Sequence, residues 1–129
     1  MLGLFTPGEH GSTFGGNPLA CAVGRESLRV LEEERLAERA AKLGPHLMQR
    51  LRSISSPHVK EVRGKGLLVG MELHPEAGGA RRVCEALMAE GVLCKETHDD
   101  VIRFAPPLVI EREQLDWAAE RTATVLARL

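Results

Sequence analysis

The stretch VKEVRGKGLLVGMEL at residues 59–73 decides the fold, because it holds two short apolar runs. The runs, at 59–62 and 67–73, are separated by Arg63-Gly64-Lys65-Gly66. They predict two strands, or one long strand that bends at the glycines. Lys65 stands between two glycines, so the sequence predicts a solvated basic turn there. A Schiff-base lysine would instead need a pKa lowered by burial or by neighbouring cations.

Helical patterns precede this stretch. Asn17 and Pro18 are typical of an N-cap and a first helical position, and they predict a helix from residue 19 to about 35. Apolar residues then recur at intervals of three and four over 36–54, which predicts a second helix. Because Gly44-Pro45 interrupts that pattern, we expect one bent helix, with the start of a new helix as the alternative.

The second half of the chain alternates between helices and strands. The pattern predicts a helix at 80–90, with Gly91 as its C-cap. Two strands follow, at 92–96 and 101–105, and a hairpin turn at 97–100 joins them. A final helix is predicted over 111–129, with acidic residues in its first turn. This order predicts an α+β domain whose helices cover one face of a small, mainly antiparallel or mixed sheet.

Composition narrows the function classes. The 129 residues suffice for one domain with its own core, and 43% apolar with 27% charged residues is typical of a soluble globular protein. A net charge of -1 gives no electrostatic case for nucleic acid or an anionic membrane, and no apolar run is long enough to span a bilayer. Cys21, Cys84 and Cys94 lack metal-site spacing and predict buried, reduced thiols in a cytoplasmic protein.

A glycine-rich loop, GEHGSTFGGNP at residues 8–18, leads into the first helix. It contains neither the Walker A pattern nor the dinucleotide-binding fingerprint. The hydroxyls of Ser12 and Thr13, together with backbone amides near a helix N-terminus, suit an anion such as phosphate. A plain structural turn is the alternative.

Arg103 is unusual because it stands inside the apolar strand VIRFAPP at residues 101–107. The alternation of the strand permits a solvent-facing position. The other interpretation is a bidentate grip on a carboxylate or phosphate. Of the histidines, His10 lies in the glycine-rich loop within reach of a ligand, whereas His98 is expected to shape the hairpin; no catalytic triad follows from the spacing.

Three motifs together, GSTFGGNPL at 11–19, RGKGLL at 63–68 and IRFAPPLVI at 102–110, resemble the C-terminal part of class III pyridoxal-phosphate aminotransferases and stand in the order of that family. Within the family the chain is most similar to the ornithine aminotransferases, on Pro7-Gly8-Glu9-His10, Lys65 and Thr97-His98. The acetylornithine aminotransferases are the alternative.

The resemblance implies a fold and roles for particular residues. Residues 17–129 would be the C-terminal small domain of a fold-type I pyridoxal-phosphate (PLP) transferase, and 1–16 a phosphate-binding loop left over from the large domain. Ser12 and Thr13 match positions that bind the PLP phosphate in the partner's site, across a homodimer interface. Arg103 matches the arginine that holds the α-carboxylate of the substrate, including 2-oxoglutarate.

The implied reaction transfers the δ-amino group of ornithine to 2-oxoglutarate, giving glutamate 5-semialdehyde and glutamate. In the family, the lysine that holds PLP and the aspartate that pairs with its pyridine nitrogen lie upstream of the loop. We therefore expect the 129 residues alone to be an inactive fragment with no catalytic residue, because its four lysines, Lys42, Lys60, Lys65 and Lys95, occupy other positions. The alternatives are a non-catalytic module that binds small anions and a dimerisation module.

Overall fold

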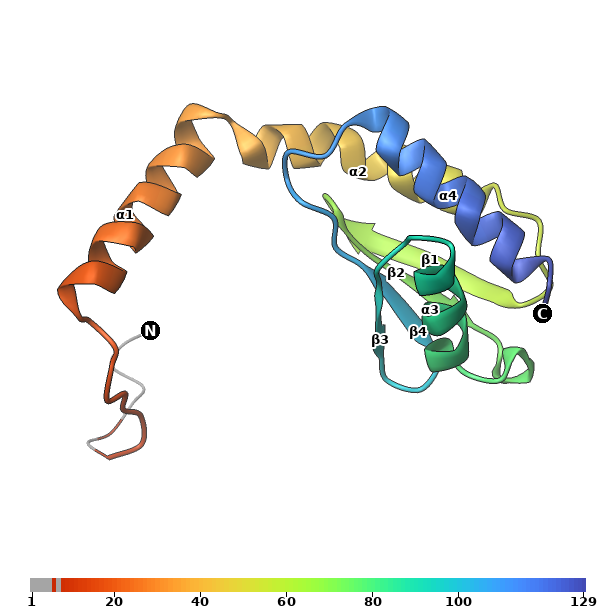
Figure 1. Ribbon diagram of the computed structural model, residues 1–129, viewed down its shortest axis with the longest axis horizontal. Helices are drawn as coiled ribbons and strands as arrows, with labels where there is room; N and C mark the ends of the chain where they lie inside the picture. The colour runs from red at the N-terminus through yellow and green to blue at the C-terminus, as the bar shows by residue number, and fades with distance from the viewer. Residues whose placement is uncertain (1–5, 7) are drawn as a thin grey trace. The chain divides into compact units, whose positions relative to one another are not determined.

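The computed structural model describes residue 6 and residues 8–129 (Figure 1). Pro7 and residues 1–5, which belong to the predicted loop, lie outside the described residues. The chain forms two compact units, residues 1–35 and residues 36–129. The predicted division is a different one: it assigns residues 1–16 to a loop of the large domain and residues 17–129 to the small domain. That division stays a prediction.

The first unit consists of the glycine-rich loop and helix α1 (Pro18–Glu33). The side chain of Asn17 accepts a hydrogen bond from the backbone N–H of Ala20 at 2.9 Å, and Pro18 occupies the first helical turn. The predicted N-cap is therefore confirmed. Within this unit α1 has no buried residue, and Leu19, Val23 and Leu28 are all more than half exposed.

The second unit contains a four-stranded sheet and three helices. The helices are α2 (Leu36–Arg52), α3 (Ala80–Ala89) and α4 (Arg112–Leu126), with a short 3₁₀ turn η2 (Pro75–Ala77) before α3. The strands are β1 (Val59–Lys65), β2 (Leu68–Leu73), β3 (Lys95–Thr97) and β4 (Val101–Phe104). Their order is β1-β2-β4-β3, and every neighbouring pair is antiparallel, which confirms the predicted α+β class and sheet type.

One face of this sheet carries the core. Alternate strand residues on that face are buried, and they form one cluster with residues of α2, α3 and α4, including Leu47, Leu51, Val83, Leu87 and Leu115. In Figure 1, α2 and α4 lie side by side along the sheet, and these two helices contact each other. The strand residues of the cluster are Val62, Val69, Met71, Leu73, Ile102 and Phe104, and the half-buried Val59 packs against it. The predicted arrangement of helices over one face is confirmed.

Helix α2 runs without interruption through Gly44 and Pro45, as expected for one helix. A Cβ placed on Gly44 would lie 2.2 Å from the carbonyl oxygen of Gly66, in the turn between β1 and β2. Glycine at position 44 therefore allows the helix backbone to touch the turn backbone directly.

The interpretation of residues 63–66 as a turn is wrong for its first three residues. Arg63, Gly64 and Lys65 belong to β1, and only Gly66, with φ +55°, lies in the two-residue connection to β2. A Cβ on Gly64 would lie 2.5 Å from the carbonyl oxygen of Leu68. Because glycine has no Cβ, β1 can continue through position 64 and pair closely with β2. Lys65 is exposed, as predicted.

The prediction of three buried cysteines is wrong for Cys21, which is exposed on α1. Cys84 is buried and Cys94 is half-buried against the core. The described residues contain no helix that is long and apolar enough to cross a membrane, and among them no group of three or more metal-binding side chains occurs. The cytoplasmic location stays a prediction.

Candidate functional site

Arg103 lies on the face of the sheet opposite the core. It pairs with Gly70 of β2 on one side and with Lys95 of β3 on the other, and Gly70 pairs in turn with Arg63 of β1. We call these four residues the basic row. The neighbours Ile102 and Phe104 are buried whereas Arg103 is exposed, so the alternation of β4 directs the arginine toward solvent.

Carboxylates neutralise the two outer cations of the basic row. Arg63 Nη1 lies 2.8 Å from Glu61 Oε2 and 2.5 Å from Glu72 Oε2. Lys95 Nζ lies 2.8 Å from Glu96 Oε1. Arg103, by contrast, makes no hydrogen bond or ion pair with any residue that the structure describes. It is therefore the one cation of the row whose donors remain available.

The carboxylates that hold the outer cations stay ionised over a wide pH range. Hydrogen bonds from Lys60, at 2.6 Å, and from Arg63 lower the pKa of Glu72. The hydrogen bond from Lys95, with a further one from Arg81, lowers the pKa of Glu96 to about 2. These ion pairs persist at neutral pH, so Arg103 keeps an uncompensated positive charge beside them.

An unpaired guanidinium in this position suits an anion with two oxygens. The group is planar and always charged, and it presents parallel N–H donors that match a carboxylate or phosphate. Arg103 is the only member of the basic row that offers this geometry without first breaking an ion pair of the described residues. The chemistry of the row is therefore binding rather than proton transfer.

Ser12 and Thr13 lie in the exposed loop before α1, as predicted. The Ser12 hydroxyl accepts a hydrogen bond from the backbone N–H of Gly15 at 2.8 Å, which leaves its own proton free to donate. Thr13 makes no hydrogen bond with the described part of the chain. Two consecutive residues that precede the N-cap of α1 therefore keep hydroxyl donors available, and a helix N-terminus favours an anion.

The loop is held in place by its own contacts. The Asn17 amide donates to the carbonyl oxygen of Phe14 at 2.7 Å while its oxygen caps α1. A Cβ on Gly15 would lie 2.9 Å from both Cβ and Oγ of Ser12, so a glycine is required for this tight turn. These contacts tie the hydroxyl-bearing residues to the start of the helix.

The predicted site residues fall in different units. Ser12 and Thr13 are neighbours in the first unit, whereas Arg103 belongs to the second. His98, with φ +57°, occupies the turn between β3 and β4, as expected for a residue that shapes the hairpin. His10 is exposed in the loop.

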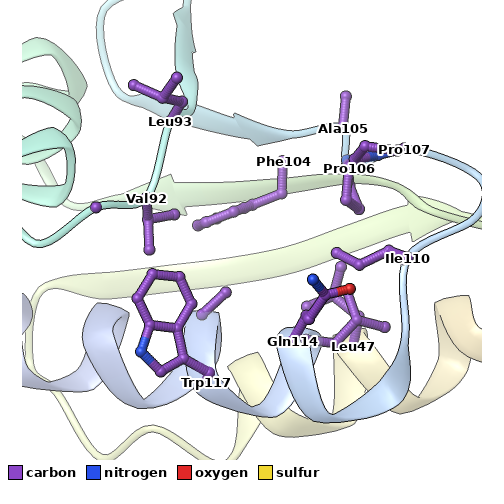
Figure 2. Close-up of a pocket in the computed structure, with 13 residues that line it drawn as sticks. Leu47, Val92, Leu93, Phe104, Ala105, Pro106, Pro107, Ile110, Gln114 and Trp117 are labelled. Carbon is purple, nitrogen blue, oxygen red and sulfur yellow. The ribbon is translucent and has the colours of Figure 1, made fainter.

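An apolar hollow of about 450 Å³ lies between the end of β4 and helix α4 (Figure 2). Its walls include Phe104, Pro106, Ile110 and Trp117. The polar side chain at its edge is Gln114, whose oxygen already accepts a hydrogen bond from the Glu111 backbone at 2.9 Å. Because Phe104 and Arg103 point to opposite faces of the sheet, the hollow does not belong to the basic row.

Sequence reasoning did not single out Gly70, which the structure places next to Arg103 in the basic row. The signal was present, because Gly70 interrupts the apolar run of β2 between Val69 and Met71. A glycine inside a strand often marks a bulge or a place where another group approaches closely. Without the register, nothing connected this glycine with Arg103, 33 positions later.

Comparisons with known proteins identify the family. The profile described as aminotransferase class-III matches residues 1–126. The chain is 60% identical to the ornithine aminotransferases of Bacillus subtilis and Geobacillus sp., over 98% of its own length and 31% of theirs. It therefore spans less than a third of the length of these curated relatives.

Solved structures agree with the sequence comparison. The ornithine aminotransferase of Plasmodium yoelii superposes with a TM-score of 0.87 at 40% identity, over 98% of this chain and 34% of that one. An acetylornithine aminotransferase from Elizabethkingia anophelis gives a TM-score of 0.85 at 41% identity, over 99% and 33% of the two chains. Because the family profile matches nearly the whole length of the chain, the chain belongs to the class-III aminotransferase family.

Proposed function

We propose that this chain provides the substrate-carboxylate and cofactor-phosphate contacts of an ornithine aminotransferase. The reaction would transfer the δ-amino group of ornithine to 2-oxoglutarate. The observation that carries the proposal is Arg103, an exposed arginine that lies among neutralised charges and has no partner of its own in the described residues. The 60% identity to bacterial ornithine aminotransferases supports ornithine as the amino donor over acetylornithine.

Arg103 would bind the α-carboxylate of the substrate through two parallel N–H donors. Because its place in the sheet is fixed by pairing on both sides, with Gly70 and with Lys95, the arginine would hold the carboxylate from a rigid support. Glu61, Glu72 and Glu96 would not compete for it, since each is already bound to another cation.

Ser12 and Thr13 would donate their hydroxyls to the phosphate of PLP. The donor set fits this group, because two free hydroxyl protons precede the N-terminus of α1 and the loop is anchored by Asn17. PLP, when bound, acts as the electron sink of amino-group transfer. In this proposal the phosphate belongs to the site of a partner subunit in a homodimer.

The 129 residues by themselves would not catalyse the reaction. A lysine that bonds to PLP must lose its proton near neutral pH, which requires burial or neighbouring cations. The side chains of Lys42, Lys60, Lys65 and Lys95 are all exposed. Ion pairing with Glu72 even raises the pKa of Lys60. None of the four therefore has the environment of a cofactor-binding lysine.

Borohydride reduction tests this part of the proposal. The isolated chain is incubated with PLP, reduced and digested, and the peptides are examined by mass spectrometry. We expect only scattered, substoichiometric labelling of the four lysines. A stoichiometric adduct on one of them would show that the chain holds the cofactor covalently and would overturn the proposed inactivity.

A second candidate function is a stand-alone module that binds small carboxylates, and the same unpaired Arg103 favours it. Calorimetric titration of the isolated chain with 2-oxoglutarate separates the two candidates. Saturable binding that disappears in Arg103→Ala would favour the binding module, whereas absence of binding would favour a contact that works only within a complete enzyme.

A further inference from the structure

We propose that Gly70 is a specificity-determining position, whose missing side chain makes room beside Arg103 for the carbon chain of the 2-oxo acid. The inference rests on the proposed function, because it assumes that Arg103 binds the carboxylate of that acid. It adds a residue from a different strand and a steric criterion for the size of the ligand. The two strands meet at this point, since Gly70 and Arg103 are direct cross-strand partners.

The backbone does not require glycine at position 70. Its φ lies outside the left-handed region, unlike that of Gly66 at +55° in the neighbouring turn. Packing does not require it either, because an added Cβ would lie 3.5 Å from Val101 Cγ1 and 3.9 Å from the Arg63 carbonyl oxygen, both ordinary contacts. Gly64, where a Cβ would lie 2.5 Å from a backbone oxygen, shows what a sterically required glycine looks like in this sheet.

A glycine inside a strand weakens the sheet, since it loses more backbone freedom on folding and offers no side chain to pack. Position 70 lies in β2, one of the two central strands, where a side chain would have partners on both sides. The absence of a side chain at this position therefore serves the exposed face of the sheet rather than its stability.

On the exposed face of the sheet, the cross-strand neighbours of Gly70 are Arg63 and Arg103. Side chains of directly opposed strand residues stand about 5 Å apart, so any side chain at position 70 would rise next to the stem of Arg103. On the far side of Gly70, the guanidinium of Arg63 is held by Glu61 and Glu72. The result is a short stretch of β2 backbone without a side chain, which the side chain of Val101 borders and which lies between a bound cation and an unbound one.

The surface formed by Gly70 and Arg103 suits a dicarboxylate with a short carbon chain. The carboxylate would bind the free Arg103, and the methylene carbons would lie over the bare backbone of Gly70. A methyl group at position 70 would fill little of this space, whereas a β-branched side chain would stand where the substrate carbons must lie. Substitution at Gly70 should therefore act through the size of the new side chain.

The test uses the PLP-loaded ornithine aminotransferase in which, under the proposed function, this chain provides the carboxylate and phosphate contacts, and it measures ornithine:2-oxoglutarate transamination. In Gly70→Val the KM for 2-oxoglutarate should rise about tenfold with little change in kcat at saturation, as expected for a steric loss of binding. Gly70→Ala should change KM by less than about threefold. Leu68→Val, a β-branched residue on the same strand and face but paired with Lys65, is the matched control and should leave KM unchanged.

Two further measurements separate a steric role from a structural one. The dissociation constant of 2-oxoglutarate, measured by calorimetry without amino donor, should rise in Gly70→Val by the same factor as KM. The thermal unfolding midpoint of Gly70→Ala should equal or exceed that of the wild type, because alanine fits and stiffens the strand. If both variants lowered the midpoint and kcat together, glycine would instead be needed for contact with another backbone, and the inference would be wrong.

Arg103→Ala separates the inference from the function on which it rests. If the wild type lacks transamination, or if Arg103→Ala leaves the KM for 2-oxoglutarate unchanged, the proposed function fails and the inference falls with it. If Arg103→Ala raises KM while Gly70→Val does not, the carboxylate contact stands and the role of Gly70 is refuted.

Discussion

Gly44 is the position where a single methyl group should damage the fold most. It lies inside α2 and faces the turn between β1 and β2. In Gly44→Ala the new Cβ would lie 2.2 Å from the Gly66 carbonyl oxygen, 2.4 Å from its carbonyl carbon and 2.7 Å from its Cα. All three are backbone atoms, so no side-chain rotation can relieve the contact.

The magnitude follows from how far the helix must move. Restoring an ordinary contact of 3.4 Å from 2.2 Å requires a displacement of about 1.2 Å, which lifts Leu47 and Leu51 from the core. Overpacking of this kind destabilises by up to about 3 kcal/mol. Alanine in a helix recovers about 1 kcal/mol relative to glycine. We therefore expect a net loss of about 2 kcal/mol in the free energy of unfolding.

Urea unfolding followed by the fluorescence of Trp117 measures this loss in the second unit, because Trp117 is the only tryptophan of the chain. With a typical urea dependence for a domain of this size, the midpoint should fall by about 1 M. Gly70→Ala, where the added Cβ makes ordinary contacts, is the control and should not lower the midpoint. A Gly44→Ala protein as stable as the wild type would refute the argument that helix and turn touch through their backbones.

Two other predictions concern titratable groups. Hydrogen-bonded ion pairs lower the pKa of Glu96 from 4.5 to about 2, so this carboxylate stabilises the fold above pH 4.5 and the stabilisation should be lost as the pH falls toward 2. The difference in urea midpoint between the wild type and Glu96→Gln should therefore shrink over that interval. A constant difference would contradict the assignment. Cys21 is exposed, whereas burial raises the pKa of Cys84 and raises that of Cys94 to about 12. A thiol reagent at neutral pH should therefore label Cys21 alone in the native protein and all three cysteines in denaturant. Rapid labelling of Cys94 in the native protein would contradict its burial.

Local sequence signals were sufficient for most of the fold. Asn17-Pro18 predicted the start of α1, the three-and-four spacing predicted α2, and the polar residues 97–100 predicted the hairpin between β3 and β4, all of which the structure confirms. These features depend on neighbours within a few residues, so a single sequence contains them.

The predicted strand at 92–96 is wrong in its bounds, because β3 covers only Lys95–Thr97. Two other wrong predictions were decided by residues outside the local pattern. Arg63-Gly64-Lys65 has the composition of a turn, yet it is a strand because Gly64 lets the backbone of Leu68 approach. Cysteine is usually a buried residue type, yet Cys21 is exposed, because none of the described residues of its own unit buries a residue of α1. In both cases the deciding partner, or its absence, lies outside the local pattern.

The candidate site shows the same division between local and distant information. Alternation in 101–107 correctly directs Arg103 away from the core, but it cannot tell an arginine that is neutralised from one that is free. That distinction requires the register, which brings Arg63 and Lys95 into the same row and assigns their carboxylates to them. Once those carboxylates are assigned, Arg103 is left with a bare glycine on one side and a bound lysine on the other. In the proposed function these two features act together, because the free guanidinium would bind the anion and the missing side chain at position 70 would leave room for its carbon chain.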